Sequence, residues 1–478
     1  MAQTRRTFLG AVGGGCLAGG ISLRLPHPGA GGGADLPELV ALVQRTPRAE
    51  LLARAVQLHA GGVHWRELLA AAFLAGIHDV QPRPVGFKFH CVLMTASAFA
   101  IADALPERER LAVALFNLDD FKNSQAQDVE AGDWTLPPAP DIGADVDAAK
   151  AAAALVAAMT ERDPAAADRA VTTLARVATL DQAFEPLWWF GARDFTNVGH
   201  HPIFVAQAYR TLQQIGWQHA EPVLRSLVWG LLAAKAGADD AAFVANQERA
   251  AALRLADDGK PSARATGDVL RDLHTKDADG AAAMVAALLH DGLALDAVLD
   301  GLRLMAIEQL WRQPGVLAVH ALTSLNALRF AAGTAQAEHT RAMALLQAAS
   351  WQVQYRDFLG RGANYDREAP GLDAIAVADG ASTPASVFAT ARAARRDTAP
   401  QALLCARAGT AGLLAAMRHW LVRKVGEHHD YKFAEALAEE IAAAAPDTAA
   451  RMFAGSVGYL RRPSDPDHAA WKLVADQH

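Results

Sequence analysis

The chain has 478 residues and a formal net charge of −7, with 52% hydrophobic and 20% charged residues. This composition predicts a packed globular protein and not a disordered chain. The negative charge, and the lack of a basic stripe interleaved with aromatic residues, exclude nucleic acid as an expected partner.

The first 33 residues have the pattern of an export signal. Arg5 and Arg6 are followed by a weakly apolar, glycine-rich run from Gly10 to Leu23. The pattern resembles a twin-arginine signal, which implies passage through the twin-arginine export machinery and a periplasmic or secreted protein. The run is too short and too rich in glycine for a stable membrane span.

Helix-forming residues dominate the rest of the chain. Alanine-rich segments occur at 147–159 and 434–445, and alanine loses the least free energy on entering a helix. Runs of alternating Val, Ile and Thr, which would indicate strands, are nearly absent. The sequence therefore predicts an all-α protein.

Histidines mark an internal repeat. His90 and His320 each open an apolar helical stretch, at an offset of 320 − 90 = 230. His78 and Glu308 share that offset, since 308 − 78 = 230. A double histidine at 200–201 recurs at 428–429, offset by 428 − 200 = 228.

Two copies of one helical unit predict two pseudo-symmetric helical-bundle repeats that pack together. We place the signal and its junction at residues 1–33, the first repeat at 34–262 and the second at 263–478. A charged stretch containing Gly and Pro joins the two repeats near residues 256–280.

Each repeat places candidate metal ligands on a helix hairpin. Prolines at 82, 84 and 314 end one helix before the next begins, because proline removes a hydrogen-bond donor and clashes with the preceding turn. His78 and Glu308 then lie near the end of the first helix, and His90 and His320 near the start of the second. A hairpin brings such positions together.

These residue types predict a metal site. Neutral imidazole and carboxylate suit Fe, Mn, Zn or Cu, whereas a thiolate site needs cysteines that this chain lacks. We predict that His78, His90, Glu308 and His320 hold one transition metal between the repeats. Iron is the first candidate, with copper, manganese or zinc as alternatives.

Three further residues are predicted to serve catalysis. Adjacent helical residues point about 100° apart, so only one histidine of each double pair can face a shared site. From these pairs we select His200 and His428. Lys88 is the third, because the second repeat has Ala318 at the matching position and an active site needs such asymmetry.

The segment from His320 to Phe330 resembles questin oxidase-like proteins, which are helical and carry a His-x-x-Thr-x-x-x-Ala-Leu-Arg-type segment. The resemblance implies oxidation of an aromatic or polyketide-like substrate with dioxygen and a reduced nicotinamide. This sequence has no nucleotide-binding fingerprint, so only the class of oxidoreductase is carried over.

The sequence therefore predicts an exported, metal-dependent oxidoreductase of the oxygenase type that acts on a small molecule. Two alternatives stay open at this point. The first is a non-catalytic periplasmic protein that captures a metal or a small ligand. The second is a structural helical repeat protein whose histidines belong to the core.

Overall fold

The computed structural model describes residues 35–143, 146–195, 197–233, 241–255, 263–391 and 395–475. All the regular secondary structure in these ranges is helical, which confirms the predicted all-α class. The predicted export signal lies outside the described residues. The division into two repeats stays a prediction.

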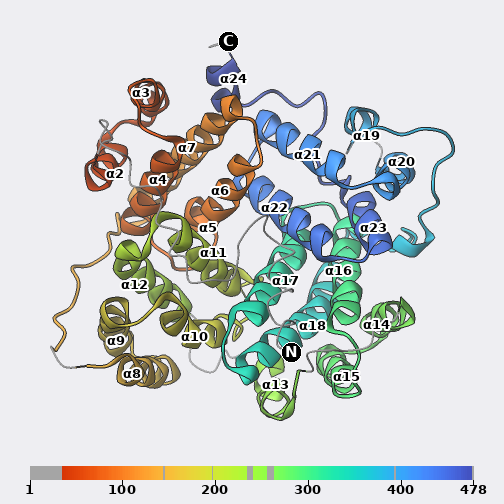
Figure 1. Ribbon diagram of the computed structural model, residues 1–478, viewed down its shortest axis with the longest axis horizontal. Helices are drawn as coiled ribbons and strands as arrows, with labels where there is room; N and C mark the ends of the chain where they lie inside the picture. The colour runs from red at the N-terminus through yellow and green to blue at the C-terminus, as the bar shows by residue number, and fades with distance from the viewer. Residues whose placement is uncertain are drawn as a thin grey trace, which may run out of the picture.

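The helices of the first half of the chain from α2 to α12 occupy one side of the molecule, whereas α13 packs on α18 and α15 of the second half (Figure 1). The first-half helices are α2 Leu36–Arg45, α3 Arg48–Ala60, α4 Trp65–Asp79, η1 Phe87–Phe89, α5 His90–Leu93, α6 Thr95–Asp103, α7 Glu107–Ala131, α8 Ala148–Glu161, α9 Pro164–Val177, α10 Leu180–Gly191, α11 His200–Ile215, η2 Trp217–His219, α12 Ala220–Leu231 and α13 Ala241–Ala252.

The helices of the second half of the chain run from α14 to α24. They are α14 Ala263–Thr275, α15 Ala278–His290, α16 Leu295–Arg312, α17 Val316–Thr334, α18 Glu338–Gly360, η3 Leu372–Ala374, α19 Pro384–Thr390, α20 Arg395–Ala408, α21 Ala411–Lys424, α22 His428–Ala443, α23 Pro446–Ser456 and α24 Ala469–Ala475.

Four helices form the middle of the molecule. Helix α11 packs on α6 and α17, and α22 packs on α17 and α6, so the two halves meet along these elements (Figure 1). Most residues of α11 and α22 are buried, and the buried residues of α22 include the charged groups of Asp430, Lys432 and Glu440. Buried charged groups are costly unless they are paired or functional.

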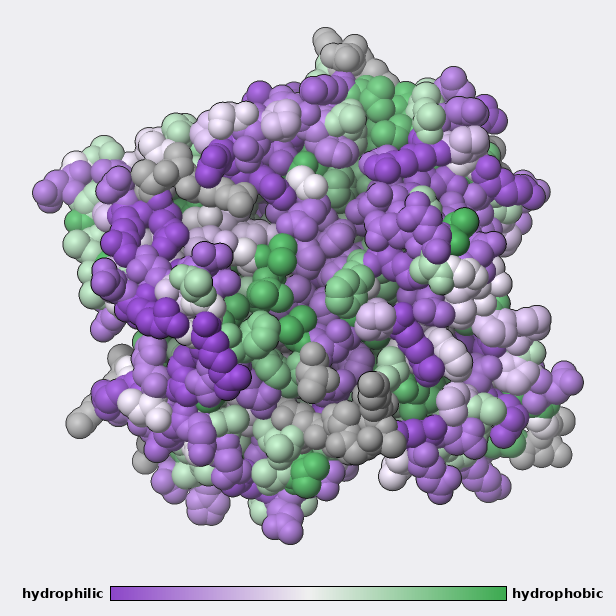
Figure 2. Space-filling model, turned by 180° about the vertical axis from the view of Figure 1, so that it is seen from behind, coloured by the Kyte–Doolittle hydropathy of each residue, from purple (hydrophilic) through white to green (hydrophobic). Residues whose placement is uncertain are grey.

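Helix α17 is the longest apolar element among the described residues. By length and composition it could cross a membrane, but 78% of its most apolar window is buried inside the molecule. It therefore serves as a core helix. The outer surface is mostly hydrophilic, with apolar side chains gathered near the middle of the face that Figure 2 shows.

A buried charged cluster holds the central helices in register. The carboxylate of Glu440 on α22 accepts hydrogen bonds from Arg303 Nε on α16 at 2.9 Å and from Arg329 Nε on α17 at 2.6 Å. Asn326 on α17 donates to the same carboxylate at 2.8 Å. Burial alone would raise the pKa of Glu440, but the two guanidinium groups lower it to about 2.

We predict that Glu440→Gln destabilises the fold by about 3–5 kcal/mol, because it removes the counter-charge that two buried guanidinium groups share and leaves only Asp300 beside Arg303 and Glu439 beside Arg329. Since the folded-state pKa is depressed, the stabilisation is present above the unfolded pKa of about 4.3 and is lost as the pH falls toward 2. Urea unfolding of both proteins checks this. A difference that persists undiminished at the lowest pH would contradict it.

Candidate metal centre

Four histidines converge at the meeting point of the central helices. They are His90 at the start of α5, His200 at the start of α11, His320 in the second turn of α17 and His429 at the start of α22. One nitrogen from each of the four rings lies within 4.8 Å of the others, and all four residues are buried. This four-histidine group could hold a transition metal.

Backbone carbonyls fix the orientation of three of the rings. In each, Nδ1 lies 2.6–2.7 Å from a carbonyl oxygen three or four residues earlier: His90 on Phe87, His200 on Asn197 and His320 on Val316. A carbonyl oxygen only accepts, so each Nδ1 must donate. In the neutral ring the lone pair then lies on Nε2, and this arrangement is typical of histidines that ligate metals.

The lone-pair nitrogens of these three rings point at one another. Nε2 of His200 lies 3.1 Å from Nε2 of His90 and 2.9 Å from Nε2 of His320. Two acceptor nitrogens at this distance repel unless a cation lies between them. Adjacent ligands of an octahedral metal, at about 2.1 Å from the ion, are about 3.0 Å apart, which matches both distances.

In the fourth histidine, His429, Nδ1 faces the side-chain carboxylate of Glu427 and not a backbone carbonyl. Nδ1 of His429 lies 3.1 Å from Oε2 of Glu427, and its buried Nε2 has no hydrogen-bond partner within the described chain. A carboxylate behind a ligating imidazole fixes the tautomer and makes the ring a stronger donor. In all four rings Nδ1 therefore points away from the centre, and the Nε2 lone pair can bind a metal ion.

The surroundings oppose protonation of the histidines. Burial lowers the pKa of His320 to about 3, with the positive charge of Lys432 as the next cause. Burial also places the pKa values of His90 and His200 well below the usual range. Protons therefore cannot relieve the repulsion between the nitrogens near neutral pH, and a metal ion can.

Lys432 is the charged group next to the centre. It is fully buried, its Nζ has no hydrogen-bond partner among the described residues, and burial lowers its pKa to about 7. A protonated Lys432 and a divalent cation would repel each other, and a pKa near neutrality allows the neutral amine. Cys91 adds no thiolate, because burial raises the pKa of its thiol far above the usual range.

The loop before η1 positions His90 and His200. Gly86 has φ of +107°, and a Cβ there would lie 2.7 Å from the ring of His200, so only glycine fits. Lys88 Nζ forms an ion pair with Asp128 Oδ1 on α7 at 2.6 Å. Asp128 also accepts from the backbone of Gln81 at 2.8 Å, so α7 holds both ends of this loop.

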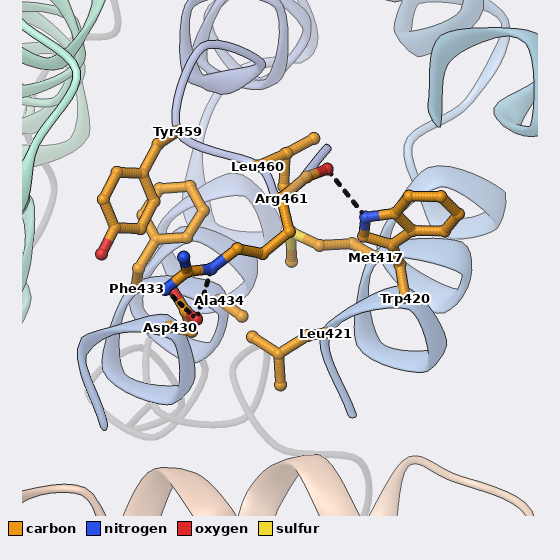
Figure 3. A pocket seen from close by; sticks show the side chains of 9 residues that line it. All are labelled: Met417, Trp420, Leu421, Asp430, Phe433, Ala434, Tyr459, Leu460 and Arg461. Carbon is orange, nitrogen blue, oxygen red and sulfur yellow. Dashed lines mark hydrogen bonds and ion pairs between the residues drawn. The ribbon is translucent and has the colours of Figure 1, made fainter. Parts of the chain in front are cut away.

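The start of α22 is fixed by the C-terminal part of the chain. Figure 3 shows the side chain of Arg461 reaching Asp430, at 2.8 Å between Nη2 and Oδ2. Asp430 also accepts from the backbone nitrogen of Gly426 at 2.8 Å, and Trp420 donates to the Arg461 carbonyl at 3.0 Å. The turn that presents His428 and His429 is thereby held from both sides.

The structure brings together only two of the four predicted metal ligands, His90 and His320. Glu308 instead forms an ion pair with Arg312 at 2.7 Å and contacts His274 at 3.3 Å. Burial would raise the pKa of Glu308, but these two neighbours lower it. His78 lines a separate cavity beside α2 and η2.

The predicted catalytic residues have three different placements. His200 belongs to the metal group itself. His428 stacks on His90, with ring centroids 4.3 Å apart and planes 9° apart, and its Nδ1 lies 3.4 Å from Asp120. Lys88 does not reach the centre, because its ion pair with Asp128 directs the side chain toward α7.

Sequence reasoning missed His429 and Lys432 as parts of this centre. The signal for His429 was available, because 429 − 200 = 229 lies within one residue of the offset that relates His90 to His320. Only His200 of the first pair belongs to the centre, but both rings of the second pair lie against His90, with centroids 4.3 Å away for His428 and 4.4 Å for His429. The second of the first pair, His201, is buried beside Asp194.

Comparisons with protein-family models, with curated proteins and with solved structures found no match to this chain. The likeness to questin oxidase-like proteins rests on the segment from His320 to Phe330 alone. The four-histidine centre is therefore the feature that bears on the function of this protein.

We predict that the purified protein binds about one transition-metal ion per chain and that His320→Ala reduces the bound metal at least tenfold, because three nitrogens no longer complete the site. Metal analysis after dialysis, with circular dichroism to show folding, measures this. His78→Ala is the matched control and should keep its metal. Equal metal content in His320→Ala and the wild type would contradict the site.

Proposed function

We propose that this protein is an exported, iron-dependent oxidoreductase that acts on a small organic molecule. The observation that carries the proposal is the convergence of three Nε2 lone pairs at 2.9 and 3.1 Å in a buried space. Iron held by four imidazoles would keep two octahedral positions open and would supply one-electron chemistry with dioxygen.

The donor set favours a redox metal over a structural one. A structural zinc site is closed and tetrahedral, and adjacent ligands at about 2.1 Å would then be about 3.4 Å apart. The two nitrogen–nitrogen distances at His200, 3.1 and 2.9 Å, are closer to the octahedral value. Imidazole nitrogens are suitable ligands for iron, copper and nickel, and iron best fits the oxygenase type of chemistry.

We propose that exposed apolar side chains in the two segments that hold His90 and His320 contact an organic substrate. Phe87, whose carbonyl holds His90, is 67% exposed, and Val316, whose carbonyl holds His320, is 37% exposed. Leu317 follows at 39%. Exposed large apolar side chains next to a polar buried centre are typical of ligand-binding sites.

His428 is positioned to move a proton at the substrate. Its side chain is 22% exposed, so it reaches solvent as well as the centre, and Asp120 lies behind its Nδ1. Stacking on His90 keeps the ring in place. A histidine oriented by a carboxylate is a common general acid or base.

We predict that His428→Ala keeps its iron and loses about 10²-fold in turnover, the usual contribution of a general acid or base. Oxygen uptake by the iron-loaded protein with a panel of aromatic and aliphatic compounds measures turnover, and His219→Ala is the control for a remote histidine. Bound iron that changes its oxidation state neither with dioxygen nor with a reductant would overturn the proposal and favour a metal-binding protein.

Export is part of the proposal and is supported by the pair Arg5 and Arg6 before the glycine-rich run. We predict that replacing both arginines with lysine retains the protein in the cytoplasm, because the export machinery reads the arginine pair. Cell fractionation of a tagged protein checks this. Unchanged export of the double variant would remove the twin-arginine route from the proposal.

A further inference from the structure

Lys432 lies one helical turn beyond the four-histidine centre on α22. It follows His429 by three residues, and residues three apart are neighbours on one helix face. Helical side chains lean toward the N-terminus of their helix, and α22 begins at the centre, so the Lys432 side chain leans toward the ligand rings. Its positive charge is, after burial, the largest cause that lowers the pKa values of His90, His320 and His429.

A water-sized cavity lies on the far side of Lys432. Its volume is about 10 Å³, which is about the space that one water molecule requires. Four of its lining residues lie seven positions after a ligand histidine: Ser97 after His90, Gln207 after His200, Ala327 after His320 and Ala436 after His429. Seven helical residues span about 10 Å. The cavity is therefore about two turns from the ligands, and Lys432, which also lines it, lies between the two.

Lys432 has no hydrogen-bond partner within the described chain. Its side chain is buried, and Nζ neither donates nor accepts a hydrogen bond among the described residues. The described residues that line the cavity include no Asp or Glu. A buried polar group without a partner is costly. The place of Nζ between the cavity and the ligand rings therefore points to a ligand that the chain itself does not supply.

The charges around a metal-loaded centre lack one negative charge. The four ligand rings are neutral, so they do not compensate the charge of a metal ion. Glu427 lies 3.1 Å from Nδ1 of His429, behind that ring. Asp120 lies 3.4 Å from Nδ1 of His428. A divalent ion and a protonated Lys432 together exceed these two carboxylates by one positive charge, which a single monoanion would balance.

The N-termini of two long helices add to the positive potential at the centre. Helices α11 and α22 have 16 residues each and begin there, with His200 and His428 as their first residues. The N-terminus of a helix carries about half of a positive charge and favours nearby anions. The two helix ends and the unpaired Lys432 therefore favour negative charge at the same place.

We propose that the four-histidine centre binds a small monoanion together with its metal ion, and that Lys432 Nζ donates a hydrogen bond to this anion. The anion takes a coordination position that the imidazoles leave open, on the side that faces Lys432. The space beside Lys432 is water-sized, so the anion has only a few atoms, as hydroxide, fluoride and azide have. This inference deepens the proposed function and rests on its metal centre alone, because anion binding needs no redox chemistry.

The experiment titrates the Co²⁺-loaded full chain with azide, whose binding changes the visible absorption of the ion. We expect Lys432→Met to weaken azide binding at least tenfold, because a charge-assisted hydrogen bond is lost. Lys432→Arg keeps a charged donor and should retain most of the affinity. The Co²⁺ content and the circular dichroism of both variants should equal those of the wild type.

Lys122→Met is the matched control. Lys122 is also a buried lysine, but its Nζ donates to the carbonyl of Gln44 on α2 at 2.7 Å. Its loss removes one positive charge at a different contact, and azide should bind as in the wild type. Nitric oxide is a neutral ligand and should bind equally well to the Fe²⁺-loaded wild type and to Lys432→Met. A general disturbance of the centre would weaken both ligands.

Diffraction from azide-soaked crystals of the metal-loaded wild type gives a second readout that needs no variant. Azide should lie on the metal and within hydrogen-bond distance of Lys432 Nζ. Full Co²⁺ binding with no azide binding, with equal azide affinity in Lys432→Met, or with azide away from Nζ would overturn the inference and leave the metal centre intact. Failure of the wild type to bind Co²⁺ would overturn the metal centre and the anion site together.

Discussion

The structure depends on one electrostatic constraint: imidazole lone pairs converge in a buried space between four helices. Backbone carbonyls hold the Nδ1 protons of His90, His200 and His320 outward, so the Nε2 nitrogens meet at 2.9 and 3.1 Å without a proton between them. Burial and Lys432 oppose protonation of the rings. A metal ion removes the repulsion, and binding to the folded state alone would stabilise the fold.

The rest of the molecule keeps these nitrogens in place. The four histidines come from four different helices, so the centre exists only while α5, α11, α17 and α22 keep their register. The carboxylate of Glu440 ties α22 to α16 and α17. Asp430 with Arg461 fixes the start of α22, and Gly86 leaves room for the ring of His200. These supports lie up to several turns from the ligands, as is usual for preorganised sites.

The all-α class could be predicted because alanine content and helical periodicity are local properties. The spacing of 230 residues also found His90 and His320, which open corresponding helices. The same spacing also selected Glu308, which does not belong to the centre, and the similar offset of the double histidines paired His200 with His428 in place of His429. Glu308 has an arginine one turn away on its own helix, and that local ion pair directs its carboxylate away from the centre. The offset of 228 residues pairs His200 with His428, whereas the residue that joins the centre is the next one, His429. A shift of one residue turns a helical side chain by about 100°. Lys432 has no sequence signature, since its effect comes from burial alone.

The most direct test of the central claim is the X-ray absorption spectrum of the iron-loaded protein. Four imidazole ligands predict a first shell of nitrogen or oxygen at about 2.1 Å and the multiple-scattering pattern of about four histidine rings. The pattern should lose one ring in His429→Ala. A spectrum with no imidazole scattering, or one with sulfur in the first shell, would contradict the account.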